Sequence, residues 1–200
     1  MPHGGPEHRD YVQYDKWAQM LANRGYLVFQ PNFRGSGGYG RAFAEACYRQ
    51  WGRLMQDDIT DGVQALVADG MADPNRICIA GASYGGYAAL AGGAFTPDLY
   101  KCVVGIAGVT DLPAFIETRE RQLGDDSAIY HYWIRLLGDP QSDAAQMKSV
   151  SPALNAEKFK APVLLIHGEK DKNVPVEQSE RMDKALRAAG ITPQKIPTMS

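Results

Sequence analysis

The sequence has no apolar run of the roughly 18 residues that a transmembrane helix needs, and it has no excess of basic residues. Twenty-one lysines and arginines stand against 23 aspartates and glutamates, which gives a formal net charge of −2, and the two signs are interleaved. We therefore expect no membrane span and no nucleic-acid-binding face. The first six residues lack the charged and apolar regions of a signal peptide, which favours the cytoplasm slightly over other compartments.

Cysteine and histidine are also scarce, with three and four residues respectively. Three thiols cannot all pair. Cys78 and Cys102 lie in apolar, strand-like runs, and Cys47 lies in an expected helix or loop, so we expect all three to be buried thiols. No His/Cys/Asp cluster has the spacing of metal ligands, so we expect no metal site.

Two hundred residues with 44% hydrophobic content suffice for one domain that buries about 70% of its unfolded surface. Apolar runs predict strands over residues 26–29, 76–80, 101–106 and 162–166, and helical spacing predicts helices over residues 11–24, 57–69, 177–189 and from 83 onward. Such alternation predicts an α/β fold, with a mostly parallel sheet covered by helices on both faces. Ligands of such sheets bind beyond the carboxyl ends of the strands, and we expect residues 111–150 to form a helical excursion over that end.

Gly81-Ala82-Ser83-Tyr84-Gly85 joins one of these strands to the helix that follows it. A G-x-S-x-G pattern alone also fits a glycine-rich turn without chemistry. A strand before it and a helix after it favour a nucleophile at Ser83, since side chains at Gly81 and Gly85 would collide with the neighbouring strand and helix. The first amides of the helix would then face a developing oxyanion.

A serine nucleophile needs a histidine to take its proton and a carboxylate to hold that histidine, in the chain order Ser, Asp, His on this architecture. Asp171 lies in a loop of turn-forming residues just after a predicted strand and is the candidate acid; the alternative is a solvated loop aspartate. Glu169 is less suitable because it is nearer the strand. The histidine should follow residue 190, where there is none. The four histidines are assigned other roles: His3 structural, His8 solvated, His131 packing or substrate-side surface, and His167 a substitute base only as a minor alternative.

Four motifs together resemble the catalytic domain of the prolyl oligopeptidase family, closest to its acylaminoacyl-peptidase and dipeptidyl-aminopeptidase branch. They are His3-Gly4-Gly5-Pro6, Asn32-Phe33-Arg34-Gly35-Ser36-Gly37-Gly38-Tyr39-Gly40, Gly81-Ala82-Ser83-Tyr84-Gly85-Gly86-Tyr87, and Pro162 to Gly168 continued through Asp171 to Pro175. The resemblance implies an α/β-hydrolase fold, Ser83 as nucleophile, Asp171 as acid, and an oxyanion hole from the amide of Tyr84 and the loop at Gly5. It also implies hydrolysis of short peptides through an acyl-enzyme, without a cofactor.

The sequence departs from the family pattern at both ends. The family domain has strands before the His-Gly-Gly-Pro loop and a closing strand, histidine loop and helix after the last residues here, and usually an N-terminal β-propeller as well. We therefore expect a single partial domain over residues 1–200, with no propeller, an impaired peptidase activity and possible homo-oligomers. A carboxylesterase acting on esters and a non-catalytic truncated hydrolase domain are the alternatives; the Gly4-Gly5-Pro6 ending of the first loop favours the peptidase.

Overall fold

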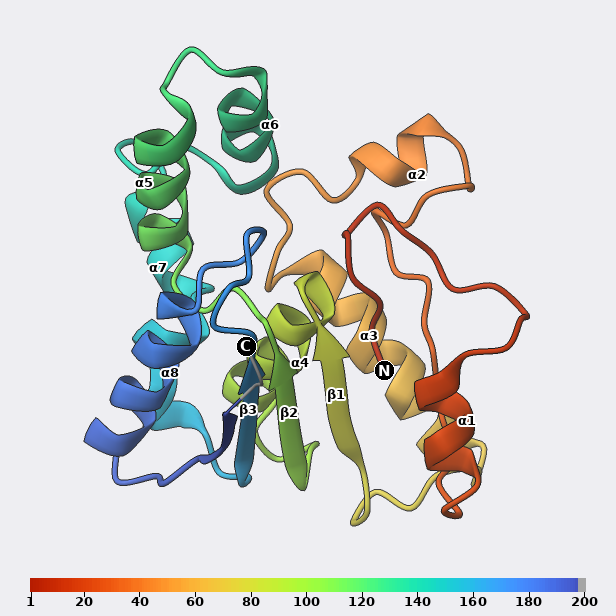
Figure 1. Ribbon diagram of the computed structural model, residues 1–200. Helices are drawn as coiled ribbons and strands as arrows, with labels where there is room; N and C mark the ends of the chain where they lie inside the picture. Colours follow the sequence, from red (N-terminus) through yellow and green to blue (C-terminus); the bar gives the residue numbers. More distant parts are fainter. Residues whose placement is uncertain (198–200) are drawn as a thin grey trace.

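A computed structural model describes residues 1–197 of the chain (Figure 1). Helices and strands alternate along it as the sequence predicts for an α/β fold. In chain order, the elements are α1 (Lys16–Ala22), α2 (Arg41–Glu45), α3 (Leu54–Ala68), β1 (Cys78–Ala82), α4 (Tyr84–Phe95), β2 (Cys102–Ile106), α5 (Leu112–Leu123), α6 (Ala128–Leu137), α7 (Ala144–Ser149), the 3₁₀ helix η1 (Pro152–Lys158), β3 (Val163–His167), α8 (Glu177–Ala188) and β4 (Gln194–Pro197).

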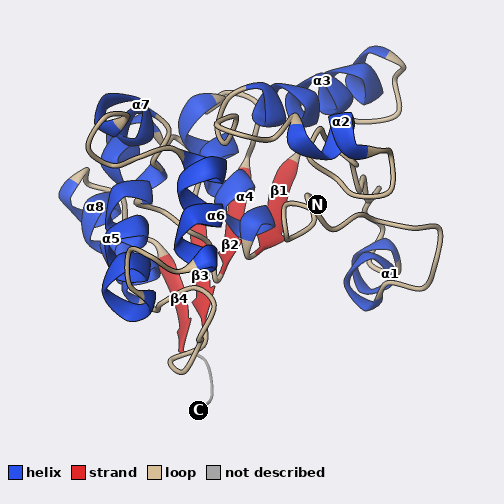
Figure 2. Cartoon of the chain, turned by 90° about the horizontal axis from the view of Figure 1, so that it is seen from above, coloured by secondary structure: helices blue, strands red, loops and turns tan. Residues whose placement is uncertain are grey.

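The four strands form one sheet in the order β1-β2-β3-β4, and every neighbouring pair is parallel. This confirms the predicted fold class. Parallel strands place all their carboxyl ends at one edge, so the segments after β1, β2 and β3 meet there. Helix α4 lies against the sheet (Figure 1), and α1 stands apart beyond the β1 edge (Figure 2).

Small residues let α4 lie close to the strands. A Cβ atom at Gly93 would lie 2.8 Å from Cγ2 of Val103, and one at Gly105 of β2 would lie 2.8 Å from Cδ1 of Leu90. The helix is buried from Tyr84 to Ala94, which explains its nearly continuous Ala/Gly/Leu composition. The core of the molecule is therefore built around the helix that follows Ser83.

At the amino-terminal end, one prediction is wrong and another is confirmed only in part. Residues 26–29 form no strand, because no strand of residues 1–197 pairs with them to complete a ladder. They are held by the chain start instead: the Met1 amino group donates to the Phe29 carbonyl oxygen at 2.6 Å. The helix expected over residues 11–24 begins only at Lys16, since the Asp15 carboxylate caps it by accepting from the Ala18 amide at 2.7 Å.

The other predicted helices are confirmed within a few residues of their ends. The helix expected over 57–69 is α3, the one expected over 177–189 is α8, and residues 111–150 contain α5, α6 and α7. None of the helices described within residues 1–197 is both long and apolar enough to cross a membrane.

The prediction of three buried thiols is wrong for two of the cysteines. Cys78 and Cys102 are joined by a disulfide, and only Cys47 is a free, buried cysteine. The reason is the register of the parallel pair: Cys78 lies directly opposite Cys102, with the Cα atoms 4.6 Å apart. That separation lies within the range that a disulfide can bridge. Spacing along the sequence could not reveal this pairing, because it depends on strand register.

Candidate active site

Ser83 lies in the turn between β1 and α4 with φ 58° and ψ −122°, a backbone conformation that non-glycine residues rarely adopt. Its amide donates to the Ile106 carbonyl oxygen at 2.9 Å, which ties the turn to the end of β2. The predicted reason for the flanking glycines holds for Gly81, where a Cβ atom would lie 2.5 Å from the carbonyl carbon of Gly85 in the following helix. It is wrong for Gly85, where a Cβ atom would meet the carbonyl oxygens of Pro2 and His3 in the first loop of the chain. The sequence therefore forms the tight strand-turn-helix that a nucleophile elbow requires.

The glycine loop at residues 3–6 lies against this turn. A Cβ atom at Gly4 would lie 3.5 Å from Cβ of Ser83 and 4.0 Å from its Oγ. The next residue, Gly5, has φ 122°, which only glycine adopts readily. The structure thus places Gly4, the residue before Gly5, against Ser83; the oxyanion-hole role of Gly5 itself remains a prediction.

The His3 ring holds the glycine loop in place. Its Nδ1 lies 2.7 Å from the Gly4 carbonyl oxygen, its Nε2 lies 2.8 Å from Oγ of Ser36, and the ring stacks on Phe33 with centroids 4.4 Å apart. Burial lowers the pKa of His3, while the contact with the Gly4 carbonyl opposes that change. The ring links the first loop of the chain to the loop at 32–40, which agrees with its predicted structural role.

The candidate acid lies in the turn that follows β3. Asp171 Oδ1 accepts hydrogen bonds from the amides of Asn173 at 2.7 Å and Val174 at 2.9 Å. The second oxygen, Oδ2, lies 3.9 Å from Nε2 of His167, which is beyond hydrogen-bond distance. The carboxylate is therefore oriented by its own turn through one oxygen, and the other oxygen is left for a further donor.

His167 is buried at the base of this turn, with both ring nitrogens occupied. Nε2 lies 2.8 Å from the Val174 carbonyl oxygen and Nδ1 lies 2.7 Å from Oγ of Ser179. Because a carbonyl oxygen can only accept, Nε2 carries the hydrogen and Nδ1 accepts from the Ser179 hydroxyl. This arrangement speaks against the substitute-base role that the sequence left open.

The two remaining histidines are also poor candidates for the catalytic base. His8 and His131 are exposed on the surface. Within residues 1–197, no histidine nitrogen makes a hydrogen bond to Ser83. The structure therefore brings together the predicted nucleophile and the glycine loop, and it gives Asp171 an oriented carboxylate, but it assigns no base to Ser83 from this part of the chain.

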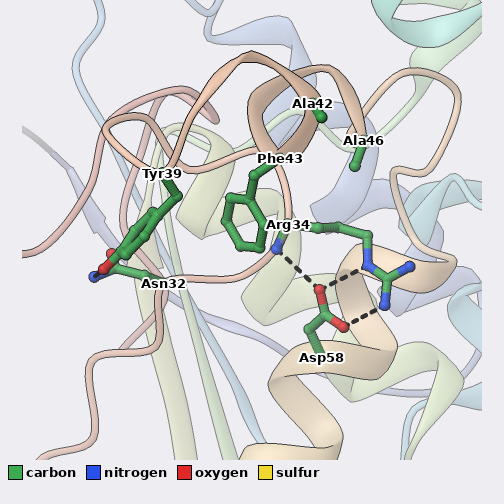
Figure 3. Close-up of a pocket in the computed structure, with 7 residues that line it drawn as sticks. All are labelled: Asn32, Arg34, Tyr39, Ala42, Phe43, Ala46 and Asp58. Carbon is green, nitrogen blue, oxygen red and sulfur yellow. Dashed lines mark hydrogen bonds and ion pairs between the residues drawn. The ribbon is translucent and has the colours of Figure 1, made fainter.

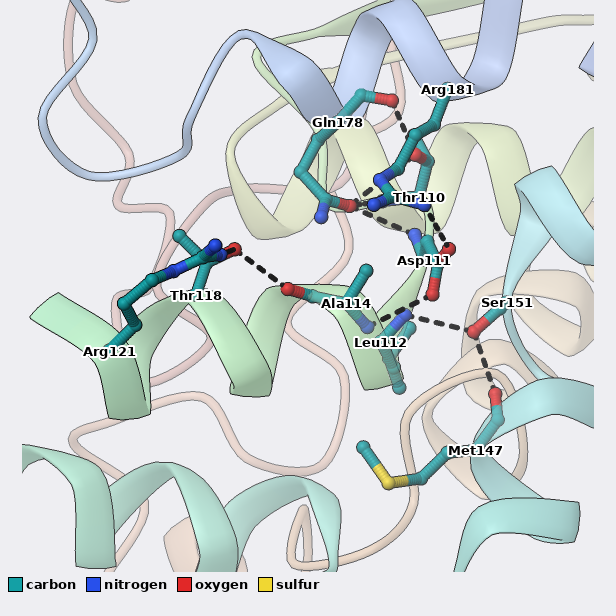
Figure 4. A network of polar contacts seen from close by, with 10 residues as sticks. All are labelled: Thr110, Asp111, Leu112, Ala114, Thr118, Arg121, Met147, Ser151, Gln178 and Arg181. Carbon is teal, nitrogen blue, oxygen red and sulfur yellow. Dashed lines mark hydrogen bonds and ion pairs between the residues drawn. The ribbon is translucent and has the colours of Figure 1, made fainter. Parts of the chain in front are cut away.

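The structure also contains a buried polar network that the sequence analysis missed (Figure 4). Oε1 of Gln178 accepts from the amides of Thr110 at 2.8 Å and Asp111 at 2.9 Å, and the Thr110 hydroxyl donates to the Gln178 carbonyl oxygen at 2.5 Å. These bonds tie the segment after β2 to helix α8. The signal in the sequence was a glutamine among the mostly apolar residues expected on the inner side of that helix.

The surface also carries a pocket of about 610 Å³ on the loop at 32–40 (Figure 3). At its wall, the Arg34 guanidinium forms a two-point ion pair with Asp58, with Nη2 to Oδ1 at 2.6 Å and Nε to Oδ2 at 2.7 Å. The residues that line the pocket are Asn32, Arg34, Tyr39, Ala42, Phe43, Ala46 and Asp58. None of them is a predicted site residue, so this pocket is separate from the chemistry considered above.

Comparison with known proteins agrees with this geometry. The model of the prolyl oligopeptidase family matches residues 12–199. The chain belongs to the prolyl oligopeptidase family. This is a family of serine peptidases, and the resemblance predicted from the motifs is confirmed.

Three relatives in the prolyl oligopeptidase family show how much of such a protein the chain represents. Dipeptidyl aminopeptidase BIII of Pseudoxanthomonas mexicana is 38% identical over 191 residues, which is 94% of this chain and 27% of the relative. A puromycin-hydrolysing peptidase of Mycobacterium tuberculosis is 33% identical with a TM-score of 0.88, over 98% of this chain and 29% of the other. Acylaminoacyl peptidase of Pyrococcus horikoshii is 28% identical, also with a TM-score of 0.88, over 100% of this chain and 32% of the other. The chain thus spans between about a quarter and a third of these relatives.

Proposed function

We propose that Ser83 is the nucleophile of a serine peptidase site that cleaves short peptides through an acyl-enzyme, with Asp171 as the acid. The observation that carries this proposal is the strained turn at Ser83, which lies against the glycine loop at residues 3–6. The names of the relatives, dipeptidyl aminopeptidase and acylaminoacyl peptidase, support peptides as the substrate class.

In this proposal, Oγ of Ser83 attacks the scissile carbonyl carbon, and the carbonyl oxygen becomes an oxyanion. Tyr84 is the first residue of α4, so its amide has no carbonyl partner four residues earlier within the helix. This N–H and that of Gly5 would stabilise the oxyanion, helped by the positive end of the helix dipole. The Oγ proton passes to a general base and from it to the amine, which leaves. Water then gives a proton to the same base and attacks the acyl carbon, and the peptide acid leaves as Oγ regains its proton.

Asp171 would act by holding a histidine in the correct tautomer. Its Oδ1 is engaged by two backbone amides, so Oδ2 is the oxygen for that histidine. The four histidines of the chain are engaged elsewhere or exposed. We therefore propose that Ser83 of this chain reacts slowly without an added base.

We also propose that the helical segment 111–150 covers the active-site end as part of this single domain. Two contacts support that role. The Tyr132 hydroxyl lies 3.3 Å from Oε1 of Glu7, next to the glycine loop, and the Trp133 ring centroid lies 6.4 Å from that of Trp51. Trp51 in turn packs on Tyr84, the residue after the nucleophile, at 4.6 Å.

The test is covalent labelling of the purified chain with a fluorophosphonate, followed by intact mass, with and without added imidazole. We expect one adduct on Ser83, formed faster with imidazole because the free base can take the serine proton; general base catalysis contributes about 10²–10⁴-fold. Ser83→Ala should abolish the adduct. Asp171→Asn should reduce the acceleration by imidazole.

Two results would contradict the proposal. One is an adduct that persists in Ser83→Ala, which would place the reactive group elsewhere. The other is a folded wild-type chain, checked by circular dichroism, that forms no adduct even with imidazole.

A further inference from the structure

We infer that Arg119 binds a carboxylate group of the peptide substrate, beside the site proposed above, on which this inference rests. The carboxylate would come from an acidic side chain of the peptide or from its free C-terminus. Neither the catalytic roles proposed above nor the folding of α5 calls for a positive charge at this position.

Arg119 lies on the inward face of α5, where an apolar residue is expected. It continues the stripe formed by Leu112, Phe115 and Ile116, and only 8% of the residue is exposed. Arginine is rarely buried to this extent unless a carboxylate or phosphate partners it. The neighbouring Arg121 shows the ordinary case, since it is exposed on the same helix.

The polar contacts of Arg119 are incomplete within residues 1–197. Its Nη1 donates to Oε1 of Gln122 at 3.0 Å, and its guanidinium lies over the Phe115 ring at 4.9 Å from the centroid. Its buried Nε has no hydrogen-bond partner among the described residues, and Arg119 forms no ion pair there. Arg34 and Arg181 differ, because each pairs with an aspartate although both are less buried.

The guanidinium of Arg119 is linked to the proposed active site through packed rings and through its charge. Burial lowers the pKa of Arg119, and the Asp171 carboxylate, which is close enough to act on its charge, opposes that change. Phe115, over which the guanidinium lies, packs on Trp133 at 4.9 Å. The contacts of Trp133 continue through Trp51 to Tyr84, so the same group of rings joins Arg119 to the nucleophile turn.

The positive charge and the unpaired Nε–H group of Arg119 indicate what kind of ligand it would bind. A guanidinium presents its N–H groups as a planar fork that matches the two oxygens of a carboxylate, and it cannot lose its charge. A peptide carboxylate that reached this position would satisfy Nε and neutralise a buried charge. A neutral amide of the same shape could accept one hydrogen bond from Nε through its oxygen, but it would leave the charge unbalanced.

The experiment is an NMR chemical-shift titration of the 200-residue chain with three acetylated tripeptides: Ac-Ala-Ala-Glu-NH₂, Ac-Ala-Ala-Gln-NH₂ and Ac-Ala-Ala-Gln-OH. We expect at least one carboxylate peptide to bind about tenfold more tightly than the neutral amide, as a charge-assisted hydrogen bond requires. Preference for the first peptide assigns the side chain, and preference for the third assigns the C-terminus. Arg119→Met should remove the preference, and Arg119→Lys should keep part of it; Arg121→Met is the matched control and should keep all of it.

Equal binding of the three peptides by the wild-type chain, or binding of none, would overturn the inference, as would a preference that survives in Arg119→Met. The wild-type comparison decides the matter even if Arg119→Met does not fold. Failure of the proposed function is a separate result: Ser83 labelling without a charge preference overturns this inference alone, and a charge preference without labelling overturns the proposed function alone.

Discussion

The Nε2 atom of His167 donates to the carbonyl oxygen of Val174 at 2.8 Å, and this bond closes the turn that carries Asp171. The other ring nitrogen accepts from the Ser179 hydroxyl, so the same buried side chain joins the end of β3, the turn and the start of α8. Asp171 owes its orientation to that turn, whose amides hold its Oδ1. His167 thus stabilises the turn that orients the proposed acid, Asp171.

His167→Ala should lower the free energy of unfolding by about 2–4 kcal/mol, since it leaves two buried polar groups unpaired and opens a cavity. His167→Gln should cost less, because its amide can still donate one hydrogen bond and accept another. Urea unfolding followed by circular dichroism measures both. His8→Ala, at an exposed histidine, is the control and should stay within about 0.5 kcal/mol of wild type. An unchanged stability of His167→Ala would mean that the turn does not depend on the ring.

Gly81→Ala should destabilise the fold strongly, because the new methyl group would meet the Gly85 backbone, with its carbonyl carbon 2.5 Å away, and backbone cannot rotate aside. Overpacking of this kind costs about 1–3 kcal/mol or more. Thermal unfolding, or the yield of soluble chain if the variant does not fold, provides the measurement. Gly168→Ala is the matched control, since nothing lies within 4 Å of its added Cβ atom. Equal melting temperatures for the two variants would refute this account of the turn.

The sequence was most informative where chemistry and backbone geometry coincide. The turn at Ser83 could be predicted because Gly81 is needed by the backbone of the same turn, and α8 could be predicted from its apolar period. The Cys78–Cys102 disulfide could not, because it depends on which residues of two distant strands lie opposite each other. Likewise, the failed strand at 26–29 has the composition of a strand but no partner in residues 1–197. Pairing between segments is information that local patterns do not carry.

The burial of Arg119 was missed for a related reason. An arginine in an amphipathic helix is normally assigned to the solvent face, and its inward position follows only from the packing of α5 against α6 and α7. The signal in the sequence was its spacing of three or four residues from Phe115 and Ile116. Spacing alone could not outweigh the expectation that a charge is solvated.

The Arg34–Asp58 pair predicts a dependence of stability on pH. Burial alone would raise the pKa of Asp58, but the hydrogen bonds and charge of Arg34 outweigh it and hold the pKa below its ordinary value of 3.8. A depressed folded-state pKa contributes stability that is present above pH 3.8 and is lost as the pH falls through the folded-state pKa. Asp58→Asn should therefore cost about 1–2 kcal/mol at pH 7, and the difference from wild type should shrink below about pH 3.8.

Urea unfolding of wild type and Asp58→Asn at a series of pH values measures this difference. Glu45→Gln is the control: it breaks the Arg41–Glu45 pair, which is far more exposed, and should leave the stability unchanged at every pH. A difference between Asp58→Asn and wild type that stays constant down to pH 2 would show that the carboxylate charge is not what stabilises the pair.

The cysteines should differ in reactivity in a defined order. Iodoacetamide should add almost no mass to the native chain, because Cys78 and Cys102 are bonded and Cys47 is buried. Burial, together with the charge of Glu7, raises the pKa of Cys47 to about 11. Only roughly one Cys47 thiol in a thousand is then ionised at pH 8, and the thiolate is the reactive form.

After mild reduction without unfolding, alkylation should appear first at Cys78, which is exposed, then at the half-buried Cys102, and last at Cys47. Intact mass and peptide mapping follow the order. In Cys78→Ser, Cys102 has no partner and should react without any reductant, which separates the effect of the bond from the effect of burial. Rapid labelling of Cys78 in the unreduced wild-type chain would show that the bond between β1 and β2 is not formed.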